Sequence, residues 1–418
     1  MNPKQHVAVI GGGAIGLCAA YYLKREGVSV TVIDKGPIGH GCSLRNAGYV
    51  CPSHFVPLAH PGVITQGMKW LLDPESPFYI KPRLSAELAS WVWRFYRSST
   101  TEHVHNTMEL LRDLCTESLR LYQDLARVDG MDFDFQEKGL CVLFKSEKAE
   151  QSMRHEAELA ARLNVEAEIL DPAQLSKLSP GVSFDVRGGL YYPGDAHISP
   201  SRFVASLHRH LESLGVTVLS GTQVNGLETS GGRITRLLTS RGSVEADEYI
   251  LAAGSWSPGL VRSLGVNLPV QAGKGYSVTV ERPEHTPTVP FILTEARVAI
   301  TPFVDGLRFA GTMELAGLDL SINRRRVEAI LQAVPRYLPD VDTSRAWSAE
   351  VWAGLRPCSP DGMPYIGRFK RWSNLIAATG HAMIGMTMAT ATGKLAMEVA
   401  LGRTPSYNLS LVSPERFS

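Results

Sequence analysis

Apolar and polar residues at the start of the chain follow a strand–helix–strand order. Residues 6–10 (HVAVI) are mostly apolar and β-branched, as a buried parallel strand requires. Residues 17–27 place apolar side chains at helical spacing and end on a glycine, which is typical of a helix C-terminus. Residues 28–34 (VSVTVID) form a second apolar run that ends on Asp34. The pattern predicts two buried strands joined by a helix.

The middle of the chain has a different pattern. Residues 51–85 are rich in Pro and Gly and show no strong period. Residues 86–128 predict helices with many aromatic residues. A strand–helix pattern returns near residue 199. The remaining expected elements are short strands at 139–144 and 188–192, a helix over 199–215, strands with a hairpin up to 254, mostly strands over 266–313, a helix over 323–333, a strand over 374–380 and a helix over 385–401.

The turn between the first strand and the first helix has the sequence G-x-G-x-x-G. Gly11 allows the tight turn, Gly13 allows the backbone to approach a pyrophosphate, and Gly16 allows the helix to pack closely on the strand. The helix N-terminus then offers N–H donors and a positive dipole to phosphates. Asp34 lies at the distance where an acid accepts the ribose hydroxyls. Together these features predict a dinucleotide site.

Two interlocked domains are expected, because 418 residues are too many for one ordinary core. The expected fold class is α/β, with a Rossmann-type dinucleotide-binding domain interleaved with an α+β substrate domain built on an antiparallel sheet. The dinucleotide-binding domain is expected over 1–50, 197–264 and 346–418, and the substrate domain over 51–196 and 265–345.

Composition and charge exclude several other classes of protein. Lys and Arg number 42 against 41 Asp and Glu, so nothing indicates a nucleic-acid partner. The six cysteines form no C-x-x-C pair, which favours reduced thiols and predicts no metal site. The N-terminus lacks a signal-peptide pattern, and no run of about 20 apolar residues is present. We therefore expect a cytoplasmic location.

Further clusters of small residues indicate close contact with a ligand. GCSLRNAGYV at 41–50 suits contact with a pyrophosphate and then with a flat ring, and a surface loop is the alternative. ILAAGSWS at 250–257 ends a buried strand in small residues, as a close approach to a ligand requires. The segment 374–395 contains T-G-H-A-M-I-G before a helix, whose N–H groups can face the negative charge of a reduced flavin.

The order of these clusters resembles that of the D-amino-acid-oxidase-like family of FAD enzymes, and within it the branch of bacterial D-amino acid dehydrogenases. The resemblance extends over nearly the whole chain. Its motifs are S-x-x-N-A-G at 43–48, M-K-W at 68–70, K-G-Y-S at 274–277, A-I-T at 299–301, G-L-R-P-x-x-P-D-G at 354–362, T-G-H at 379–381 and G-R-T-P near the end.

The resemblance implies that the dinucleotide is FAD. We expect it to be bound non-covalently, because Cys358 is out of register with the cysteine through which some relatives link their flavin. The ADP half would be held by Gly11, Gly13, Ala14, Ile15, Gly16, Asp34 and Lys35, with Val224 near the adenine and Gly254 and Trp256 closing over the nucleotide. The pyrophosphate-to-flavin segment would be lined by Ser43, Asn46, Ala47 and Gly48, and the flavin ring by Gly380, Met383, Ile384, Gly385 and Met386.

Three residues are candidates for the substrate site. Arg356 corresponds to the arginine that similar enzymes use for the substrate carboxylate, and a guanidinium independently suits that task because it binds a carboxylate through two hydrogen bonds. The alternative is that Arg356 pairs with a carboxylate such as Asp361. Tyr276 could donate to the carboxylate or be an ordinary strand aromatic. The setting of His381 favours a backbone role beside the flavin over acid–base catalysis.

The reaction that the resemblance implies is oxidation of a D-amino acid, with hydride passing from Cα to flavin N5. The imino acid then hydrolyses to a 2-oxo acid and ammonia. Relatives that oxidise glycine have an arginine where this chain has the apolar segment 382–384, so apolar substrates are expected. An oxidase that uses O2, of the D-amino acid or glycine/sarcosine type, and a dehydrogenase restricted to D-proline or hydroxyproline remain alternatives, as does a flavin-containing binding protein. A pyridine-nucleotide reductase is disfavoured, because no second dinucleotide motif is present.

A dehydrogenase of this kind passes its electrons to a quinone, or to an artificial dye in the laboratory. Quinones lie in the bilayer, so we expect peripheral contact with the inner face of the cytoplasmic membrane. The segment 68–96 mixes Trp and Phe with Lys and Arg, as an interfacial surface does. The alternative is that this segment is a helical layer that covers the substrate domain.

Overall fold

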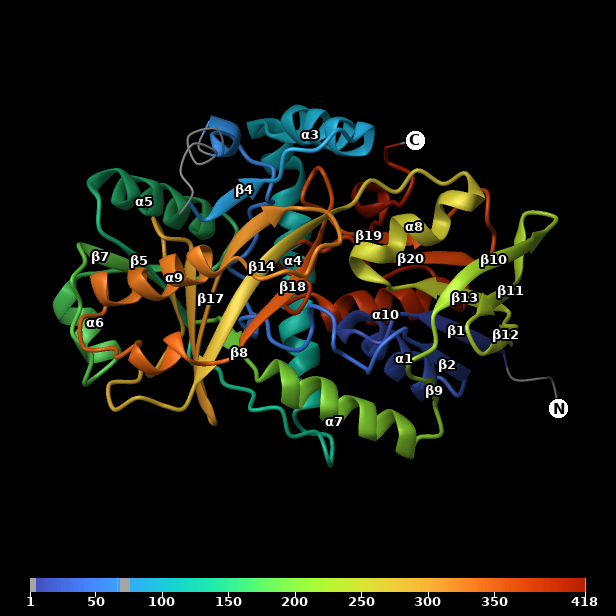
Figure 1. The fold of residues 1–418 in the computed structure, drawn as a ribbon, viewed down its shortest axis with the longest axis horizontal. Helices are drawn as coiled ribbons and strands as arrows, with labels where there is room; N and C mark the ends of the chain where they lie inside the picture. Colours follow the sequence, from blue (N-terminus) through green and yellow to red (C-terminus); the bar gives the residue numbers. More distant parts are fainter. Residues whose placement is uncertain (1–4, 66, 68–75, 418) are drawn as a thin grey trace.

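The computed structural model describes residues 5–65, 67 and 76–417. The M-K-W motif at 68–70 and the neighbouring residues up to 75 therefore lie outside the described residues. The N-terminal pattern forms the centre of a sheet that has six strands within the described residues, in the order β19-β20-β13-β1-β2-β9 (Figure 1). All neighbours are parallel except β19 and β20. The strands are β1 (His6–Ile10), β2 (Ser29–Ile33), β9 (Thr217–Leu219), β13 (Glu248–Leu251), β19 (Tyr365–Arg368) and β20 (Leu375–Thr379).

A larger, mixed sheet forms the second half of the molecule. In the described part of the chain it has nine strands, in the order β18-β14-β17-β16-β15-β5-β7-β6, with β4 paired to β17. Its pairs are antiparallel except β15 with β5 and β17 with β4. The strands are β4 (Phe78–Ile80), β5 (Leu140–Phe144), β6 (Glu168–Leu170), β7 (Gly188–Tyr192), β14 (Gln271–Val280), β15 (Phe291–Leu293), β16 (Val298–Phe303), β17 (Gly306–Leu315) and β18 (Val351–Cys358).

Helices pack on both sheets. Helices α1 (Ala14–Arg25), α7 (Pro200–Ser213) and α10 (Ala389–Ala400) belong to the first sheet, and α10 contacts α1 and α4. Helices α3 (Ala86–Ser98), α5 (Glu147–Arg162), α6 (Pro172–Leu178) and α9 (Arg324–Ala333) accompany the second sheet. Helix α4 (Thr101–Leu125) packs on α10, and the short α8 (Ser257–Val261) follows β13. The small elements are β3 (Tyr49–Val50) with β8 (Ala196–His197), and a meander of β10 (Val224–Ser230), β11 (Arg233–Thr239) and β12 (Gly242–Val244).

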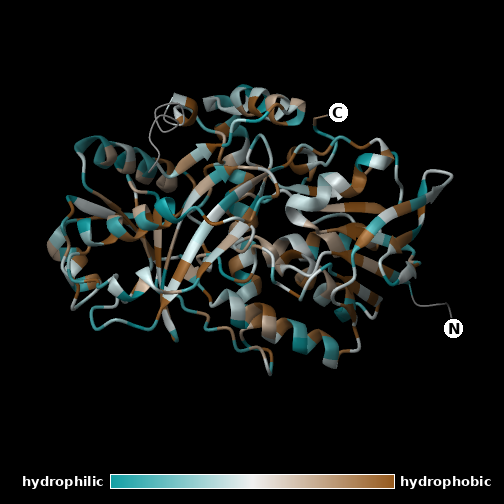
Figure 2. Cartoon of the chain, viewed as in Figure 1, coloured by the Kyte–Doolittle hydropathy of each residue, from teal (hydrophilic) through white to brown (hydrophobic). Residues whose placement is uncertain are grey.

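The predicted fold class is confirmed. The strands expected at 6–10, 28–34, 139–144 and 188–192 are present, as are helices within 86–128, 199–215 and 323–333. The interior of each half is apolar: one core surrounds β1, α1 and α10, and another lies between the large sheet and α9. Figure 2 shows the corresponding hydrophobic strands and the hydrophilic outer helix α5. No helix within the described ranges is long and apolar enough to cross a bilayer.

Three elements differ from the expectation. The boundary expected at 346 divides the chain before β18, whereas β18 pairs with β14 over eight residue pairs and is therefore an edge strand of the large sheet. The last helix begins at Ala389 rather than 385, because residues 382–388 form turns. Helix α5, capped by Ser146, was not expected from the sequence pattern.

Candidate flavin and substrate site

The G-x-G-x-x-G turn requires glycine at its first and last glycine positions. Gly11 has φ +115°, and an added Cβ would collide with the carbonyl of Ala252 in the segment after β13. A Cβ on Gly16 would collide with the carbonyl oxygen of Gly11. The two glycines thus bring α1 and β13 close to the end of β1, so that the N-terminus of α1 points past the C-terminal edge of the sheet.

Asp34 lies beside this turn at the end of β2. Its carboxylate accepts from the N–H of Gly12 at 2.8 Å and from that of Gly36 at 2.9 Å. The next residue, Lys35, places its ammonium 3.5 Å from the ring centroid of Trp256. The backbone carbonyl of Asp34 accepts from Thr222, two residues before β10 begins at Val224. The structure therefore gathers Asp34, Lys35, Val224 and Trp256 at one edge of the sheet.

The loop at 43–48 is fixed by its own hydrogen bonds. The Ser43 hydroxyl accepts from the N–H of Ala14 at 3.0 Å, at the start of α1. Asn46 donates to the carbonyls of Cys42 and Ser43, and its Oδ1 accepts from the N–H of Gly48 at 2.8 Å. Gly48 has φ +74°.

Hydrogen bonds also join the 43–48 loop to the large sheet. The carbonyl of Ala47 accepts from the Thr301 hydroxyl at 2.8 Å, and that of Asn46 accepts from Arg308 at 2.7 Å. The loop thus bridges the start of α1 and the large sheet.

The T-G-H-A-M-I-G segment forms a turn that contacts β18. Gly380 has φ +81° and Ala382 has φ +46°. The N–H of Ala382 donates to the carbonyl of Pro357 at 2.9 Å, and Ile384 donates to the carbonyl of His381 at 3.0 Å. Met383 is 56% exposed, whereas Met386, after Gly385, is buried.

His381 is held in a neutral state. Its Nε2 lies 2.9 Å from the Thr392 hydroxyl, and the residue is 2% exposed. Burial lowers the pKa of His381 to about 3. A neutral imidazole fixed in this way agrees better with a role for the backbone of His381 beside the flavin than with acid–base catalysis by its side chain.

Arg356 is half-buried on β18 and reaches across β14. Its Nη1 donates to the carbonyl of Thr312 on β17 at 2.8 Å. A Cβ on Gly275, which lies between them on β14, would be only 2.5 Å from the guanidinium carbon. Asp361 instead forms two hydrogen bonds with Arg416, at 2.6 and 2.8 Å. The alternative pairing of Arg356 with Asp361 is therefore not formed, and Arg356 has no ion pair with any residue in the described ranges.

Tyr276 lies on the opposite face of the large sheet. On β18, Tyr276 pairs with Ala353, which lies three residues before Arg356. Because successive side chains of a strand alternate between its faces, the side chains of Tyr276 and Arg356 point to opposite faces of the sheet. The Tyr276 hydroxyl donates to Glu314 at 2.8 Å and accepts from the N–H of Asn323. The structure therefore does not bring Tyr276 together with Arg356.

Several contacts of the site are not indicated by any motif. Gly254, at φ +54°, precedes Ser255, whose hydroxyl donates to the carbonyl of Leu355 beside Arg356. The hydroxyl of Tyr122 on α4 donates to the carbonyl of Met386 at 2.7 Å. These contacts join residues 100 and 264 positions apart, so no local pattern identifies them.

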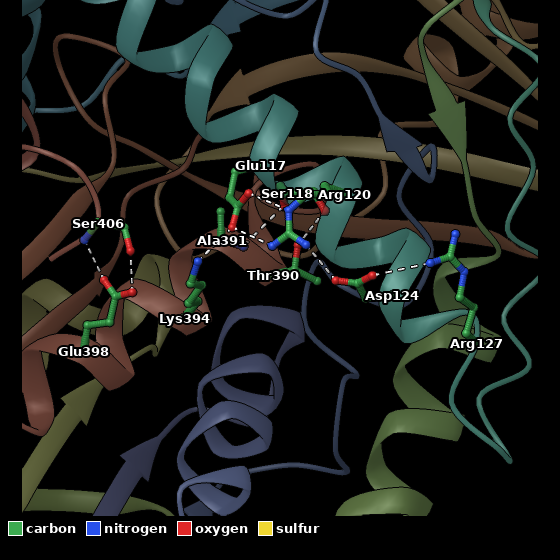
Figure 3. Close-up of polar contacts among 10 residues, drawn as sticks. All are labelled: Glu117, Ser118, Arg120, Asp124, Arg127, Thr390, Ala391, Lys394, Glu398 and Ser406. Carbon is green, nitrogen blue, oxygen red and sulfur yellow. Dashed lines mark hydrogen bonds and ion pairs between the residues drawn. The ribbon is translucent and has the colours of Figure 1, made fainter.

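Helix α4 also braces α10 through side chains (Figure 3). The buried hydroxyls of Ser118 and Thr390 lie 2.6 Å apart, and Lys394 donates to Glu117 at 2.8 Å. Next to these contacts, Arg120 forms ion pairs with both Glu117 and Asp124 on the outer side of α4. The turn before α10 is therefore anchored by α4 as well as by its own sheet.

Cys51, His54 and Asp195 form a cluster whose potential ligand atoms lie within 4.8 Å of one another. Both carboxylate oxygens of Asp195 already accept from Ser53, at 3.1 Å from the N–H and 2.5 Å from the hydroxyl. Burial raises the pKa of Asp195 to about 7. The hydrogen bonds of this cluster thus hold the 51–54 loop against Asp195.

The residues gathered at the edge of the six-stranded sheet fit FAD. The first N–H groups of a helix have no intrahelical acceptor, and those of α1 point past the glycine turn. The Ser43 hydroxyl, which accepts from Ala14, still has its own proton to donate to a phosphate oxygen. A Cβ on Gly13 would lie 3.1 Å from the Ser43 hydroxyl oxygen, Asp34 offers acceptors to a ribose, and the 380–386 turn lies beside the strand of Arg356.

Comparison with known proteins agrees with this geometry. A family model described as FAD dependent oxidoreductase matches residues 6–399. D-amino acid dehydrogenase of Methylobacterium radiotolerans is 35% identical over 410 residues, 96% of each chain, and that of Vibrio atlanticus is 34% identical over 98% and 99% of the two chains.

Solved structures are similar at lower identity. Glycine oxidase from Bacillus cereus superposes with a TM-score of 0.77 at 23% identity, covering 98% of both chains. L-proline dehydrogenase from P. horikoshii superposes with a TM-score of 0.78 at 18% identity, covering 100% of this chain and 98% of the other. These likenesses concern the fold. The chain belongs to the D-amino-acid-oxidase-like (DAO) family of FAD dependent oxidoreductases, and its cofactor is FAD.

Proposed function

We propose that the protein is an FAD-dependent D-amino acid dehydrogenase, which converts a D-amino acid to the imino acid that hydrolyses to a 2-oxo acid and ammonia. The observation that supports it most is the guanidinium of Arg356, which has a carbonyl partner but no carboxylate among the described residues. The relatives named D-amino acid dehydrogenase, at 33–35% identity over nearly the full length, support the same assignment.

The tasks of the chain are binding and orientation. Bound FAD supplies the two-electron chemistry. Arg356 takes the substrate carboxylate through its remaining N–H groups and so fixes the direction of the Cα–H bond. With the carboxylate fixed, exchanging the hand of the substrate swaps its amine and side chain, so one enantiomer fits far better. His381 stays neutral and takes no proton, and the amine releases its proton to solvent on binding.

The cofactor is proposed to be non-covalent. Cys358 is fully buried, its thiol donates to the carbonyl of Arg356, and burial raises its pKa to about 12. A buried, protonated thiol is a poor nucleophile toward a flavin. Acid precipitation is expected to leave a yellow supernatant, whereas a yellow pellet would contradict the proposal.

The substrate pocket is proposed to accept apolar side chains. The segment 382–384 (AMI) carries no charge next to the strand of Arg356, and Met383 can adapt its shape to different ligands. A methylene in such a pocket discriminates by only about 1–3 kcal/mol, so the substrate range is expected to be broad.

The acceptor is proposed to be a membrane quinone, reached through the outer face of α3. The inner face of this helix packs Trp91 against the segment after Arg356, where its indole donates to the carbonyl of Cys358. The outer face exposes Val92, Trp93 (60%) and Tyr96 (63%) beside a shallow groove. Aromatic side chains next to arginines suit the interface of an anionic bilayer.

The membrane contact is tested by flotation with anionic lipid vesicles. The wild-type protein is expected to float with the vesicles, and Trp93→Ser/Tyr96→Ser is expected to remain below. Equal recovery of both proteins in the bottom fraction would contradict membrane contact and leave the dehydrogenase assignment unaffected.

Anaerobic bleaching of the flavin tests the proposed reaction. We expect bleaching by D-amino acids with apolar side chains, little by their L-enantiomers, and faster reoxidation by a quinone analogue than by air. Reoxidation by air at the same rate would favour an oxidase. Bleaching by glycine or sarcosine alone, or by D-proline alone, would favour the corresponding restricted enzymes, and no bleaching by any amine would favour a binding protein.

A further inference from the structure

The pairing of β14 with β17 contains a bulge directly beside Arg356. Lys274 pairs with Glu314 and Tyr276 pairs with Gly311. An advance of two residues along β14 therefore corresponds to three residues along β17, so β17 has one extra residue. Within this bulge Thr312 has φ +68°, a left-handed conformation that β-branched residues rarely adopt. Unusual backbone conformations of this kind persist only where the surroundings fix them, and they are concentrated at functional sites.

The bulge directs one carbonyl group toward the guanidinium. The carbonyl of Thr312 accepts from Nη1 of Arg356 at 2.8 Å, although β14 lies between the two strands. Gly275 makes this reach possible, because any side chain there would occupy the place of the guanidinium. A regular β17 would use the Thr312 carbonyl within the ladder, since carbonyls of a paired strand face their neighbours in the sheet.

A buried charged cluster holds the bulge from the opposite face of the sheet. Glu314 is 4% exposed and lies 3.5 Å from Lys274 and 3.3 Å from Arg326. It also accepts from the hydroxyl of Tyr276. Arg326 in turn donates to the carbonyl of Ser76 at 2.6 Å. These contacts fix the residue two positions after Thr312.

The edge strand β4 holds the other side of the bulge. The N–H of Met313 donates to the carbonyl of Pro77 at 2.7 Å, and Met313 pairs with Phe78. The two residues that follow Thr312 are thus both anchored, Met313 by β4 and Glu314 by the charged cluster, and these contacts hold the conformation of the bulge.

We propose that Thr312 is a positioning residue for carboxylate recognition. Its left-handed backbone presents a carbonyl that takes Nη1 of Arg356, and the remaining N–H groups of the fork face the substrate carboxylate. The inference rests on the proposed function, because it requires that Arg356 binds a carboxylate. The backbone carbonyl of Thr312, and not its hydroxyl, positions the guanidinium.

Substitutions at 312 separate backbone from side chain. Thr312→Gly accepts positive φ without strain, and Thr312→Val keeps the branched shape without the hydroxyl. Thr312→Pro cannot adopt positive φ. The readout is the dissociation constant of benzoate, followed by the change in the flavin spectrum of the FAD-loaded protein, with benzamide as the ligand that lacks the carboxylate.

The expected results differ sharply between these variants. Thr312→Gly and Thr312→Val bind benzoate within threefold of wild type, whereas Thr312→Pro binds it at least tenfold more weakly with unchanged FAD content and unchanged benzamide binding. Wild-type benzoate binding by Thr312→Pro, or a tenfold loss in Thr312→Val, overturns the inference. An equal loss for benzoate and benzamide also overturns it, because a general disturbance of the pocket would then be the cause.

A second variant covers the case in which Thr312→Pro yields no FAD-loaded protein. Glu314→Gln keeps the size of the side chain but weakens the cluster behind the bulge, and we expect at least threefold weaker benzoate binding. Wild-type affinity in this variant would contradict the inference. Failure of the proposed function gives a different result: benzoate binding would then be equal in wild type and Arg356→Leu, whatever residue 312 is.

Discussion

Arg356 reaches its position because the strand it crosses has no side chain at that point. Gly275 lies beneath the guanidinium, and on β18 itself a Cβ on Gly354 would collide with the ring of Trp352. Glycine in a strand interior usually weakens the strand, so its presence here marks a close approach. The glycine of K-G-Y-S thus provides the space that the guanidinium occupies, and that of G-L-R-P provides the space for the Trp352 ring.

Gly275→Ala is expected to displace the guanidinium without removing its charge. Overpacking by one methyl group costs about 1–3 kcal/mol, so kcat/KM for a D-amino acid should fall by roughly 10- to 100-fold. FAD content should not change. The matched control is Gly226→Ala, where the added Cβ meets only a side chain at 3.8 Å. Unchanged kinetics in Gly275→Ala would show that Arg356 does not need this space.

Tyr276→Phe is expected to affect stability more than substrate binding. The buried hydroxyl donates to Glu314, which keeps Lys274 and Arg326 as partners in the variant, so its removal should cost about 0.5–1.5 kcal/mol in the free energy of unfolding. Steady-state kinetics and urea unfolding measure the two effects. A tenfold rise in KM at unchanged stability would indicate that the hydroxyl contacts the substrate after all.

The sequence predicts the role of a residue when the residues that it acts with are close to it in the chain. Gly11, Gly16 and Asp34 lie within one short βαβ unit, and their spacing alone indicates their roles. Arg356 stands out by chemistry and resemblance. Thr312 does not, because its significance depends on a register shift between two strands and on contacts with residues about 40 positions away in either direction.

Helix α4 connects the two halves at the scale of elements. Its buried face meets α10 through Ser118, while its outer turns carry exposed ion pairs such as that of Arg120 (Figure 3). Since α10 follows the turn at 380–386 and Tyr122 of α4 donates to Met386 in that turn, the conformation of the turn depends on α4.

Ser118→Ala is expected to destabilise the protein by about 1–3 kcal/mol, because the buried hydroxyl serves both Thr390 and the N–H of Ala391. Arg120→Ala should cost less than about 1 kcal/mol, since its side chain is 53% exposed and solvent screens its ion pairs. Urea unfolding of the FAD-loaded proteins measures both. Equal losses in the two variants would show that the buried hydrogen bond has no special weight.

The periodic elements were predicted more successfully than their assignment to sheets. The pattern predicts the helices within 86–128, but the expected dinucleotide-binding domain at 346–418 includes the segment that forms β18, which pairs in the large sheet. The reason is physical: an apolar strand has the same local pattern in either sheet, and only its pairing with β14 decides. The late start of α10 has a similar origin, because the glycine-containing turn before it is apolar and resembles helix.

At the scale of the whole molecule, burial leaves several histidines neutral. Desolvation lowers the pKa of His54 and His197 to about 4 and that of His381 to about 3, below the unfolded value of about 6.5. The stability that these groups contribute is fully present above pH 6.5 and is lost as the pH falls toward 4. Asp195 acts in the opposite sense, because its raised pKa of about 7 lets the folded state hold a proton that the unfolded state releases near pH 4.

The free energy of unfolding should therefore rise with pH between about 4.5 and 6. Near pH 5 these four groups together give a net difference of about two protons, or about 2–3 kcal/mol per pH unit. Asp195→Asn removes the group that opposes the histidines. The slope of the free energy of unfolding against pH should then increase by an amount that corresponds to about one further proton. Urea unfolding at several pH values measures both slopes, and an identical slope in Asp195→Asn would contradict the assigned pKa.

Anaerobic reduction of the bound FAD, followed in a stopped-flow instrument, tests the central claim most directly. Wild type and Arg356→Leu are each mixed with D-alanine, L-alanine and D-alaninamide. In wild type the account predicts rapid bleaching by D-alanine and slow bleaching by the other two. In Arg356→Leu, with full FAD content, the ratio of the reduction rate constant to the dissociation constant for D-alanine should fall at least 100-fold and approach that for D-alaninamide, as removal of the half-buried charged partner implies. Wild-type reduction of Arg356→Leu by D-alanine, or bleaching of wild type by L-alanine alone, would contradict it.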